Sequence, residues 1–335
     1  MQKKGHEFVI TSRDKDITQS LLEIYNIPFY NRGRGANSLL GKALCALKTD
    51  HFIYRIAKKT KPDLFLSFAS PYAAQVAALL RKPHIAFDDT DHANLSHRMY
   101  VPFSDVIITP VSYKKDFGKN HIRIHGTPKL CYLHKNYFKP NPDIYDYLKI
   151  SKEVRYVILR FVSLNASHDI GEKGIEMALK IELAKKLSEK YKVFISSENE
   201  LPSELRPYKI NIPYEKMHDA LYYSDLIIGE SGMSSEAIIL GTQSIGVWKD
   251  INGVNMDEIN YGMLHHFLYS TNEIIDKAME LLNTPDFKIK SQELASKMLT
   301  NFIDVTAFFV WFLENYPESK KIMQINPAYQ NKFML

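Results

Sequence analysis

The sequence predicts an α/β protein of two doubly wound domains, each built on a parallel sheet. Short apolar segments alternate with segments of helical pattern along most of the chain, as expected for strands joined by crossover helices. The alternation stops at a turn-rich linker, residues 139–143, and then begins again. A length of 335 residues accommodates two domains of ordinary size. Two such domains are expected to face a cleft at the carboxyl ends of their strands.

The N-terminal domain is predicted to span residues 1–138. Extended, apolar segments predict strands at 7–11, 27–30, 64–68, 84–87 and 106–109. Helices are predicted between them at 16–25, 38–59 and 73–80. A helix between two apolar strands returns the chain to the same edge of the sheet, so the strands are expected to be parallel.

The C-terminal domain is predicted to span residues 150–290. Its strands are expected at 156–162, 193–196, 209–212, 226–228 and 244–247, and its helices at 173–190, 217–223 and 234–240. Residues 291–316 are rich in aromatic side chains and predict a closing helix that packs against one or both domains. Residues 317–335 are predicted to be a loosely held tail.

Composition excludes several classes of protein. Hydrophobic residues make up 45% of the chain and charged residues 24%, as in soluble globular proteins. No apolar run approaches the ~18 residues that span a bilayer, and no signal peptide is visible, so we expect a cytoplasmic protein. Cys45 and Cys131 match no metal spacing and are expected to be reduced thiols. The spacing of His121, His125 and His134 predicts surface or hinge residues and no metal site.

The net charge of +5 is too small to predict a nucleic-acid partner. Residues 1–60 nevertheless carry 11 Lys and Arg against 5 Asp and Glu. Many of these cations lie in or beside the predicted helix 38–59. Such a basic amphipathic surface has two interpretations, a peripheral contact with the inner face of a membrane or a solvated helix face.

The segment 226–247 combines a buried strand, a glycine turn, a helix start and a second buried strand. The unpaired N–H groups at a helix start and the helix dipole favour a bound anion in such a turn. Glu236 lies in the first turn of the predicted helix, where its carboxylate could accept hydrogen bonds from sugar hydroxyls. A nucleotide-sugar would satisfy both features. The alternative is that Gly229 and Gly232 only form the turn and Glu236 only caps the helix.

Asp88, Asp89, Asp91 and His92 directly follow the predicted strand 84–87. Crowded carboxylates raise one another's pKa, which suits a general acid or base. Two alternatives stay open, a divalent metal site and simple capping of the strand end.

Two further loops follow predicted strands. Ser70 and Tyr72 lie in a strand-to-helix turn that could hold an acceptor or a phosphate, or could be only a tight turn. Arg160 and His168 lie at the end of the first strand of the C-terminal domain. We assign Arg160 to the donor side and His168 to catalysis, with helix capping as the alternative role of the loop around His168.

The chain resembles one known family in several separate motifs that occur in the right order. That family is the uncharacterised domain of unknown function three-five-four of archaea and bacteria, and the resemblance covers about residues 5–315. The motifs that carry it are Lys61-Pro-Asp-Leu, Ser70-Pro-Tyr-Ala-Ala, Phe87-Asp-Asp-Thr-Asp-His-Ala, Arg160-Phe-Val, Ala166-Ser-His-Asp-Ile-Gly, Ser235-Glu-Ala and Leu240-Gly-Thr.

This family is similar to the GT-B superfamily, which includes the lipid-linked N-acetylglucosamine transferase of peptidoglycan synthesis and the non-hydrolysing UDP-N-acetylglucosamine 2-epimerase. The resemblance implies a GT-B fold with the nucleotide-sugar in the C-terminal domain. It implies that Glu236 contacts the ribose and the backbone near Ile212 the base. It places residues 88–92 on the acceptor side and implies no bound metal or other cofactor. The residues implied to contact the diphosphate are Ser231, Gly232, Met233 and Ser234.

The chain differs from the family pattern at its start. Members usually have one further strand, a glycine-histidine loop and most of a helix before the position of Gly5. We therefore expect that a central first strand of the N-terminal domain is missing, through an upstream start or an incomplete form.

These observations predict a glycosyltransferase that uses a nucleotide-sugar donor and a glycan or lipid-linked acceptor in cell-surface glycan synthesis. The first alternative is a nucleotide-sugar epimerase or hydrolase. The second is a non-catalytic protein that binds sugar nucleotides.

Overall fold

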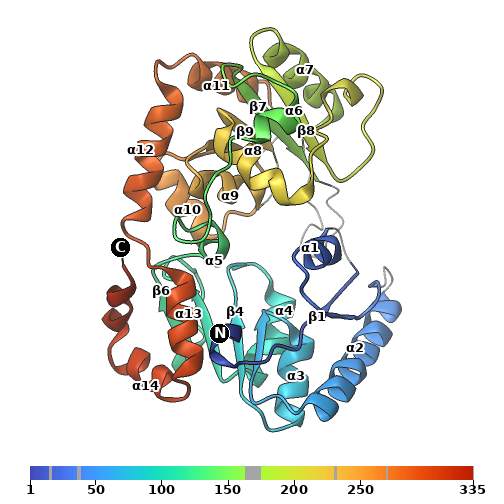
Figure 1. Ribbon diagram of the computed structural model, residues 1–335, viewed down its shortest axis with the longest axis vertical. Coiled ribbons are helices and arrows are strands. Elements are labelled where there is room, and N and C mark those ends of the chain that lie inside the picture. Colours follow the sequence, from blue (N-terminus) through green and yellow to red (C-terminus); the bar gives the residue numbers. More distant parts are fainter. Residues whose placement is uncertain (15–16, 36–38, 163–174, 230–231, 269–270, 335) are drawn as a thin grey trace. The chain divides into compact units, whose positions relative to one another are not determined.

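The computed structural model describes residues 1–14, 17–35, 39–162, 175–229, 232–268 and 271–334. Its chain forms two compact units. Unit 1 comprises residues 1–124 and 307–330, and unit 2 comprises residues 125–306 and 331–335. The fold class is the predicted one, because each unit is built on parallel strands joined by helices (Figure 1).

Unit 1 contains two separate parallel sheets. The four-stranded sheet has the order β3-β4-β5-β6, and a two-stranded sheet pairs β1 with β2. Both residues exposed on the edge strand β3 are apolar, Leu66 and Phe68. The strands of this unit are β1 (Thr11–Ser12), β2 (Tyr30–Asn31), β3 (Phe65–Phe68), β4 (His84–Phe87), β5 (Val106–Pro110) and β6 (His121–Ile124).

Three helices of unit 1 lie where the sequence predicts them, within a few residues. They are α1 (Thr18–Ile24), α2 (Leu39–Thr60) and α3 (Pro71–Leu79), whereas α4 (Asn94–Tyr100) was not predicted. Helix α2 packs on α3 through Ile53, Ala57 and Val76 (Figure 1). Pro71 begins α3 because the first turn of a helix needs no N–H at that position.

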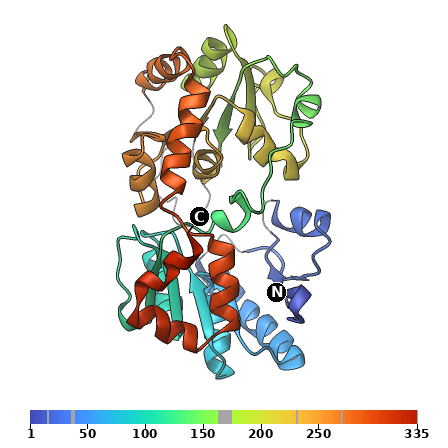
Figure 2. The same ribbon diagram turned by 60° about the vertical axis from the view of Figure 1, so that its left-hand side comes forward.

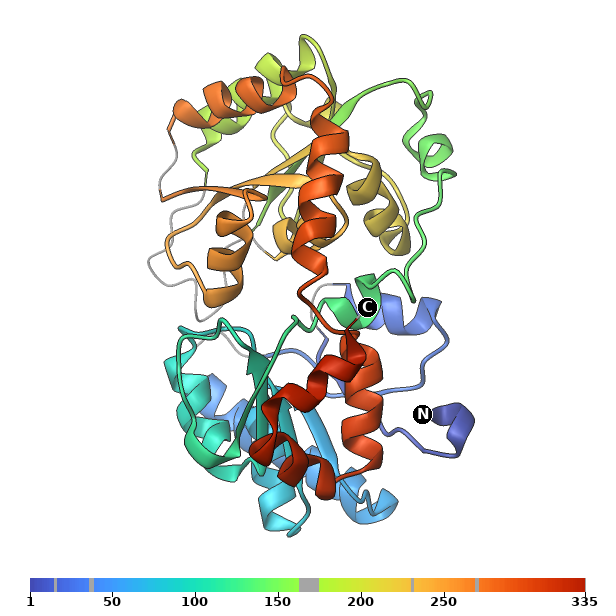
Figure 3. The same cartoon turned by 90° about the vertical axis from the view of Figure 1, so that its left-hand side faces the viewer.

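The C-terminal segment completes unit 1. Helices α13 (Val305–Glu314) and α14 (Glu318–Ile325) lie beside the four-stranded sheet (Figures 2 and 3). Phe309 contacts Phe87 of β4 with ring centroids 3.8 Å apart, and Lys320 Nζ donates to the carbonyl of Asp105. The predicted loosely held tail is therefore wrong, because residues 317–330 form helix with buried side chains.

Unit 2 contains one five-stranded parallel sheet in the order β11-β10-β9-β7-β8. Its strands are β7 (Tyr156–Phe161), β8 (Lys192–Ser197), β9 (Leu226–Gly229), β10 (Gln243–Val247) and β11 (Leu264–Phe267). Its helices are α5 (Leu130–Leu133), α6 (Ile144–Leu148), α7 (Met177–Ser188), α8 (Met217–Tyr223), α9 (Met233–Ile239), α10 (Gly253–Asn260), α11 (Glu273–Leu282) and α12 (Phe287–Leu299).

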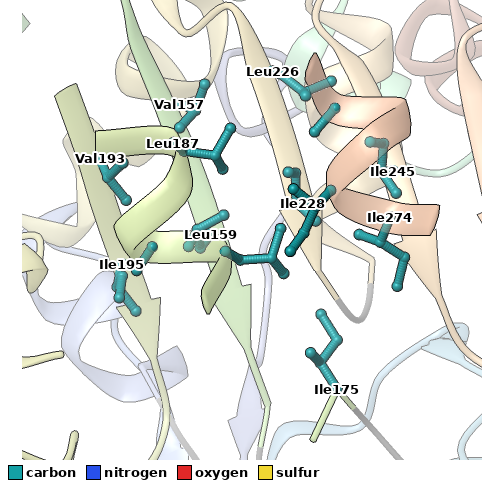
Figure 4. Packing of buried hydrophobic residues seen from close by; sticks show 14 of the residues in the cluster. Val157, Leu159, Ile175, Leu187, Val193, Ile195, Leu226, Ile228, Ile245 and Ile274 are labelled. Carbon is teal, nitrogen blue, oxygen red and sulfur yellow. The ribbon is translucent and has the colours of Figure 1, made fainter. Parts of the chain in front are cut away.

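The core of unit 2 lies between one face of this sheet and helices α7 and α11 (Figure 4). Leu159 of β7 and Ile228 of β9 are fully buried in it, as are Leu187 of α7 and Ile274 of α11. Strands buried on both faces are continuously apolar, which explains why they were recognisable in the sequence.

Two element predictions for unit 2 need correction. The predicted strand 209–212 does not form, because only Lys209 bridges to Ile195 of β8. The predicted closing helix 291–316 is two helices, α12 and α13, separated at residues 300–304. The strand β11 and the helices α5, α6, α10 and α11 were not predicted.

Candidate functional site

Strands β7 and β9 approach each other closely at the carboxyl edge of the unit 2 sheet, and a glycine makes this approach possible. Strand β9 ends at Gly229, opposite Arg160 of β7. A Cβ atom added at Gly229 would lie 2.2 Å from the carbonyl oxygen of Arg160. Any larger residue would therefore push β7 and β9 apart. The chain then turns into α9, which begins at Met233.

Glu236 lies in the first turn of α9, as predicted. The Tyr132 hydroxyl donates a hydrogen bond to Glu236 Oε1 at 2.7 Å, and His218 Nε2 lies 3.6 Å from the same oxygen. Burial alone would raise the pKa of Glu236. The hydrogen bond and charge of His218, with Tyr132 and Lys129, outweigh burial and lower the pKa. Glu236 is therefore an ionised acceptor whose side chain is 21% exposed.

Lys129 is a further member of this group that sequence reasoning missed. Its Cε lies 3.8 Å from the position that a Cβ on Gly232 would occupy. Its charge favours the ionised form of both Glu236 and Glu258, although burial still raises the pKa of Glu258 overall. Lys129 therefore lies at the start of α9, where the helix dipole already favours a negative charge.

Glu258 is a second carboxyl group that sequence reasoning missed. It is 3% exposed, and burial raises its pKa despite hydrogen bonds from Asn255 and Ser235. Asn255 donates from Nδ2 to Glu258 Oε2 at 3.0 Å and also forms the capping box of α10 with Asn252. Glu258 therefore anchors α10 to α9 from within the fold.

The other residues predicted to contact the nucleotide-sugar differ in their exposure to solvent. Gly232 is exposed, Met233 is partly exposed and Ser234 is buried. Ser231 lies outside the described residues. Ile212 is partly buried and lies in no strand, so its predicted backbone position at a strand end is wrong.

Arg160 lies at the end of β7 and is directed toward β8. Its guanidinium donates to Ser196 Oγ at 3.0 Å and to Glu198 Oε1. His168, the catalytic candidate of the following loop, lies outside the described residues. The donor role of Arg160 and the catalytic role of His168 therefore stay predictions.

Asp88 is the centre of a buried hydrogen-bond network in unit 1. It is 1% exposed and accepts from the Thr90 N–H at 2.8 Å and from Tyr100 OH at 2.6 Å. His97 Nε2 at 3.0 Å and Tyr113 OH at 3.1 Å are its other partners. Burial alone would raise the pKa of Asp88, but the hydrogen bonds from His97, Tyr100 and Thr90 outweigh it and lower the pKa.

The rest of the predicted acidic cluster is divided by burial. Asp91 is 6% exposed and accepts from the backbone N–H of Lys114 at 2.8 Å. Asp89 and His92 are partly exposed. The two buried carboxylates thus organise the loop that follows β4, while Asp89 and His92 are the members that solvent reaches.

On the predicted acceptor side, Ser70 is the N-cap of α3. Its Oγ accepts from the Ala73 N–H at 3.5 Å, a capping role that the sequence analysis did not assign to it. The ring of Tyr72 lies beneath the guanidinium of Arg32, 5.8 Å from its centroid. Ser70 and Tyr72 therefore lie together at the carboxyl end of β3.

Two of the three histidines assigned to the surface or a hinge are buried. His121 lies in β6 with a side chain 2% exposed, and its Nε2 is 2.7 Å from Thr109 Oγ1. His134 is 6% exposed and lies 3.8 Å from Asp304. Both positions are explained by local packing that spacing along the chain cannot show.

Comparison with known proteins shows the family of this chain. The family described as "Protein of unknown function (DUF354)" matches residues 1–310. The chain belongs to this family. An uncharacterised protein of Methanocaldococcus jannaschii is 27% identical over 285 residues, which are 82% of each chain.

Solved structures share the fold of this DUF354 protein. The UDP-GlcNAc 2-epimerase of Neisseria meningitidis bound to UDP-GlcNAc has a TM-score of 0.58 at 15% identity, covering 89% of this chain and 93% of that one. The glycosyltransferase SsfS6 of Streptomyces sp. SF2575, complexed with thymidine diphosphate, has a TM-score of 0.60 at 14% identity, covering 93% and 92%. The GT-B fold predicted from the sequence is thereby confirmed.

Proposed function

We propose that the protein binds a nucleotide-sugar at the carboxyl edge of the unit 2 sheet and transfers the sugar to a glycan or lipid-linked acceptor. The observation that carries this proposal is the ionised Glu236, held by Tyr132 and His218 in the first turn of α9. Lys129 beside Gly232 adds a cation at the place where a diphosphate would lie.

The proposed chemistry follows from these charges. A glycosyl transfer from a nucleotide-sugar leaves a negative charge on the departing diphosphate. Lys129 and the backbone N–H groups at the start of α9 would stabilise that charge as it develops. Glu236 would accept hydrogen bonds from the ribose hydroxyls, so Tyr132 and His218 orient it before the nucleotide arrives.

The acceptor would be activated from unit 1. Asp89 and His92 are the partly exposed acid–base groups after β4, and either could accept a proton from an acceptor hydroxyl. Ser70 and Tyr72 lie after β3 and would contact the acceptor.

A lipid-linked acceptor also needs contact with a membrane surface. None of the described helices is both long and apolar enough to cross one. One side of α2 is exposed and carries no acidic residue, and we name it the α2 basic face. Its members are Leu44, Leu47, Lys48, His51, Arg55, Lys58 and Lys59. Two exposed leucines among cations fit an anionic membrane surface, which we propose this face contacts.

The second candidate is a nucleotide-sugar epimerase or hydrolase, because epimerases are among the proteins of the same fold. A non-catalytic binding protein is the third. Incubation with a panel of nucleotide-sugars separates them. Release of nucleotide that depends on an acceptor supports transfer. Release or isomer formation without an acceptor supports the second candidate, and binding without turnover supports the third.

The donor site is tested by calorimetric titration of nucleoside diphosphates into the Glu236→Gln variant. A charge-assisted hydrogen bond is worth about 1.5–3 kcal/mol, so we expect binding weaker by about 10–150-fold. The matched control is Glu273→Gln, an exposed acid in the first turn of α11 in the same unit. Equal affinity of the two variants would remove Glu236 from the site.

A further inference from the structure

Two arginines lie directly opposite each other at the carboxyl ends of β1 and β2. The paired strands end with Ser12 opposite Asn31, so Arg13 and Arg32 are the next pair in this parallel register. The Arg32 N–H donates to the Ser12 carbonyl at 2.8 Å, which continues the ladder to this point. Neighbouring residues of a parallel ladder direct their side chains to the same face. The two guanidinium groups are thus brought close together.

This pairing is unfavourable for the fold alone. Like charges directly opposite each other in a sheet are destabilising. Burial lowers the pKa of Arg32, and the charge of Arg13 lowers it further. Arg32 Nε is buried and has no hydrogen-bond partner among the residues that the structure describes. The carboxylate nearest along the chain, Asp14, is bound to Arg34 Nε at 2.9 Å.

Arg32 is partly buried against an aromatic ring, whereas Arg13 is exposed beside a glycine. The Tyr72 ring, in the first turn of α3, lies beneath Arg32 at 5.8 Å. The Arg13 guanidinium lies over Gly35, where an added Cβ would be 2.1 Å from its terminal nitrogen. Gly35 therefore leaves room that a side chain would fill. Two neighbouring cations, one of them packed against an aromatic ring, are the arrangement of an anion site.

We propose that Arg13 and Arg32 bind a phosphate group of the second substrate, the acceptor. This inference rests on the proposed function for its biological role. Two guanidinium groups supply two positive charges and several donors in planar forks. A phosphate monoester or diphosphate carries about two negative charges near neutral pH and matches that charge, whereas a carboxylate carries one. The acceptor is thus a phosphorylated sugar or a lipid-linked phosphate, which share this chemistry.

The experiment is a titration of the full chain with inorganic pyrophosphate, followed by calorimetry. Arg32→Lys and Arg13→Lys keep the charge and remove the fork, and each is expected to weaken binding about tenfold or more. Arg34→Lys is the matched control, because it lies in the same loop and is bound to Asp14. It is expected to bind as the wild type does. Equal binding by all three variants would overturn the proposal.

Thermal unfolding gives a readout that a structural role would not produce. Arg32→Gln removes the repulsion, so without ligand it is expected to unfold at the same or a higher temperature than the wild type while its pyrophosphate binding is lost. The wild type is expected to gain thermal stability with pyrophosphate, and Arg32→Gln is not. A large fall in the unfolding temperature of ligand-free Arg32→Gln and Arg32→Lys would mean that Arg32 serves the fold and would overturn the proposal.

Two further arms identify the source of the phosphate and separate this proposal from the donor site. Lys129→Gln removes the cation of the donor side and is expected to keep Arg32-dependent pyrophosphate binding even if no nucleotide-sugar binds. Loss of all pyrophosphate binding in Lys129→Gln alone would overturn the inference. Vesicles that carry a polyprenyl phosphate and a soluble sugar 1-phosphate are then compared. Arg32-dependent binding to either supports the proposal and names the source, and binding to neither overturns it.

Discussion

Replacing Asp88 by Asn tests whether the carboxylate after β4 is the centre of a structural network. Asp88 accepts hydrogen bonds from one backbone N–H, one imidazole N–H and two phenols. Lys115 Nζ lies 2.9 Å from His97 Nδ1, and an ammonium only donates, so Nδ1 accepts and Nε2 carries the proton toward Asp88. All four partners of Asp88 are therefore donors.

The magnitude follows from this count. An Asn side chain keeps one oxygen, which can still accept from Thr90, but its amide group cannot accept from Tyr100, His97 or Tyr113. Tyr113 can donate instead to the Thr90 carbonyl at 3.3 Å, which leaves two donors unsatisfied. Each buried donor left unsatisfied costs about 1–3 kcal/mol, so two cost about 2–6 kcal/mol of the free energy of unfolding. For a unit of this size the unfolding midpoint falls by about 2–4 °C per kcal/mol, so we expect a fall of at least ~4 °C.

The assay is thermal unfolding followed by near-ultraviolet circular dichroism, with Asp63→Asn as the control. Asp63 is an exposed carboxylate of the same unit, and its variant is expected to melt like the wild type. The pKa of Asp88 is lowered in the folded state, so its contribution is present above the unfolded pKa of ~3.9 and is lost as pH falls below it. An Asp88→Asn midpoint within about 1 °C of the wild type would refute the network argument.

Three further outcomes are expected. Gly229→Ala should lower unfolding stability by about 1–3 kcal/mol because its Cβ would meet the Arg160 backbone. Gly232→Ala should melt like the wild type, because its Cβ would meet Lys129 Cε at 3.8 Å, an ordinary van der Waals contact. Burial lowers the pKa of Lys288 to about 7, so the unfolded chain binds more protons from about pH 7 to 10 and stability should rise with pH there. Lys288→Met should lose that rise. Leu44→Gln on the α2 basic face should weaken sedimentation with anionic vesicles and leave nucleotide binding unchanged.

The sequence predicts the elements of this fold where one signal dominates. Strand β4 and helix α8 have the bounds that the sequence predicts, because a short, mostly apolar run and a compact helical segment each give one clear signal. The segment 209–212 alternates polar and apolar residues, as a strand does, but forms a single bridge, since tertiary pairing decides whether an extended segment becomes a strand. The aromatic segment 291–316 contains a break that composition does not reveal.

The candidate site shows the same limit. Glu236 was found from the sequence because it lies beside a local turn signal. Its partner Tyr132 is 104 positions away, and Lys129 and His218 also come from other elements. No local pattern links these residues, because the chain path through α5, α8 and α9 brings them together. The buried carboxyl group of Glu258 also has no sequence signal that distinguishes it from a solvated helix face.

Burial distinguishes Asp88 from Glu236, two of the acidic residues that the sequence singled out. The pKa is lowered for both Asp88 and Glu236, and in both cases hydrogen bonds outweigh the cost of burial. Asp88 is 1% exposed and shares its oxygens with four donors of the fold, so a substrate would have to break the network to reach it. Glu236 is 21% exposed, and Tyr132, its closest partner, is itself an exposed side chain that a ribose hydroxyl could replace. A lowered pKa therefore marks a well-bonded carboxylate, and only the exposure of that carboxylate and of its partners distinguishes a ligand site from a structural one.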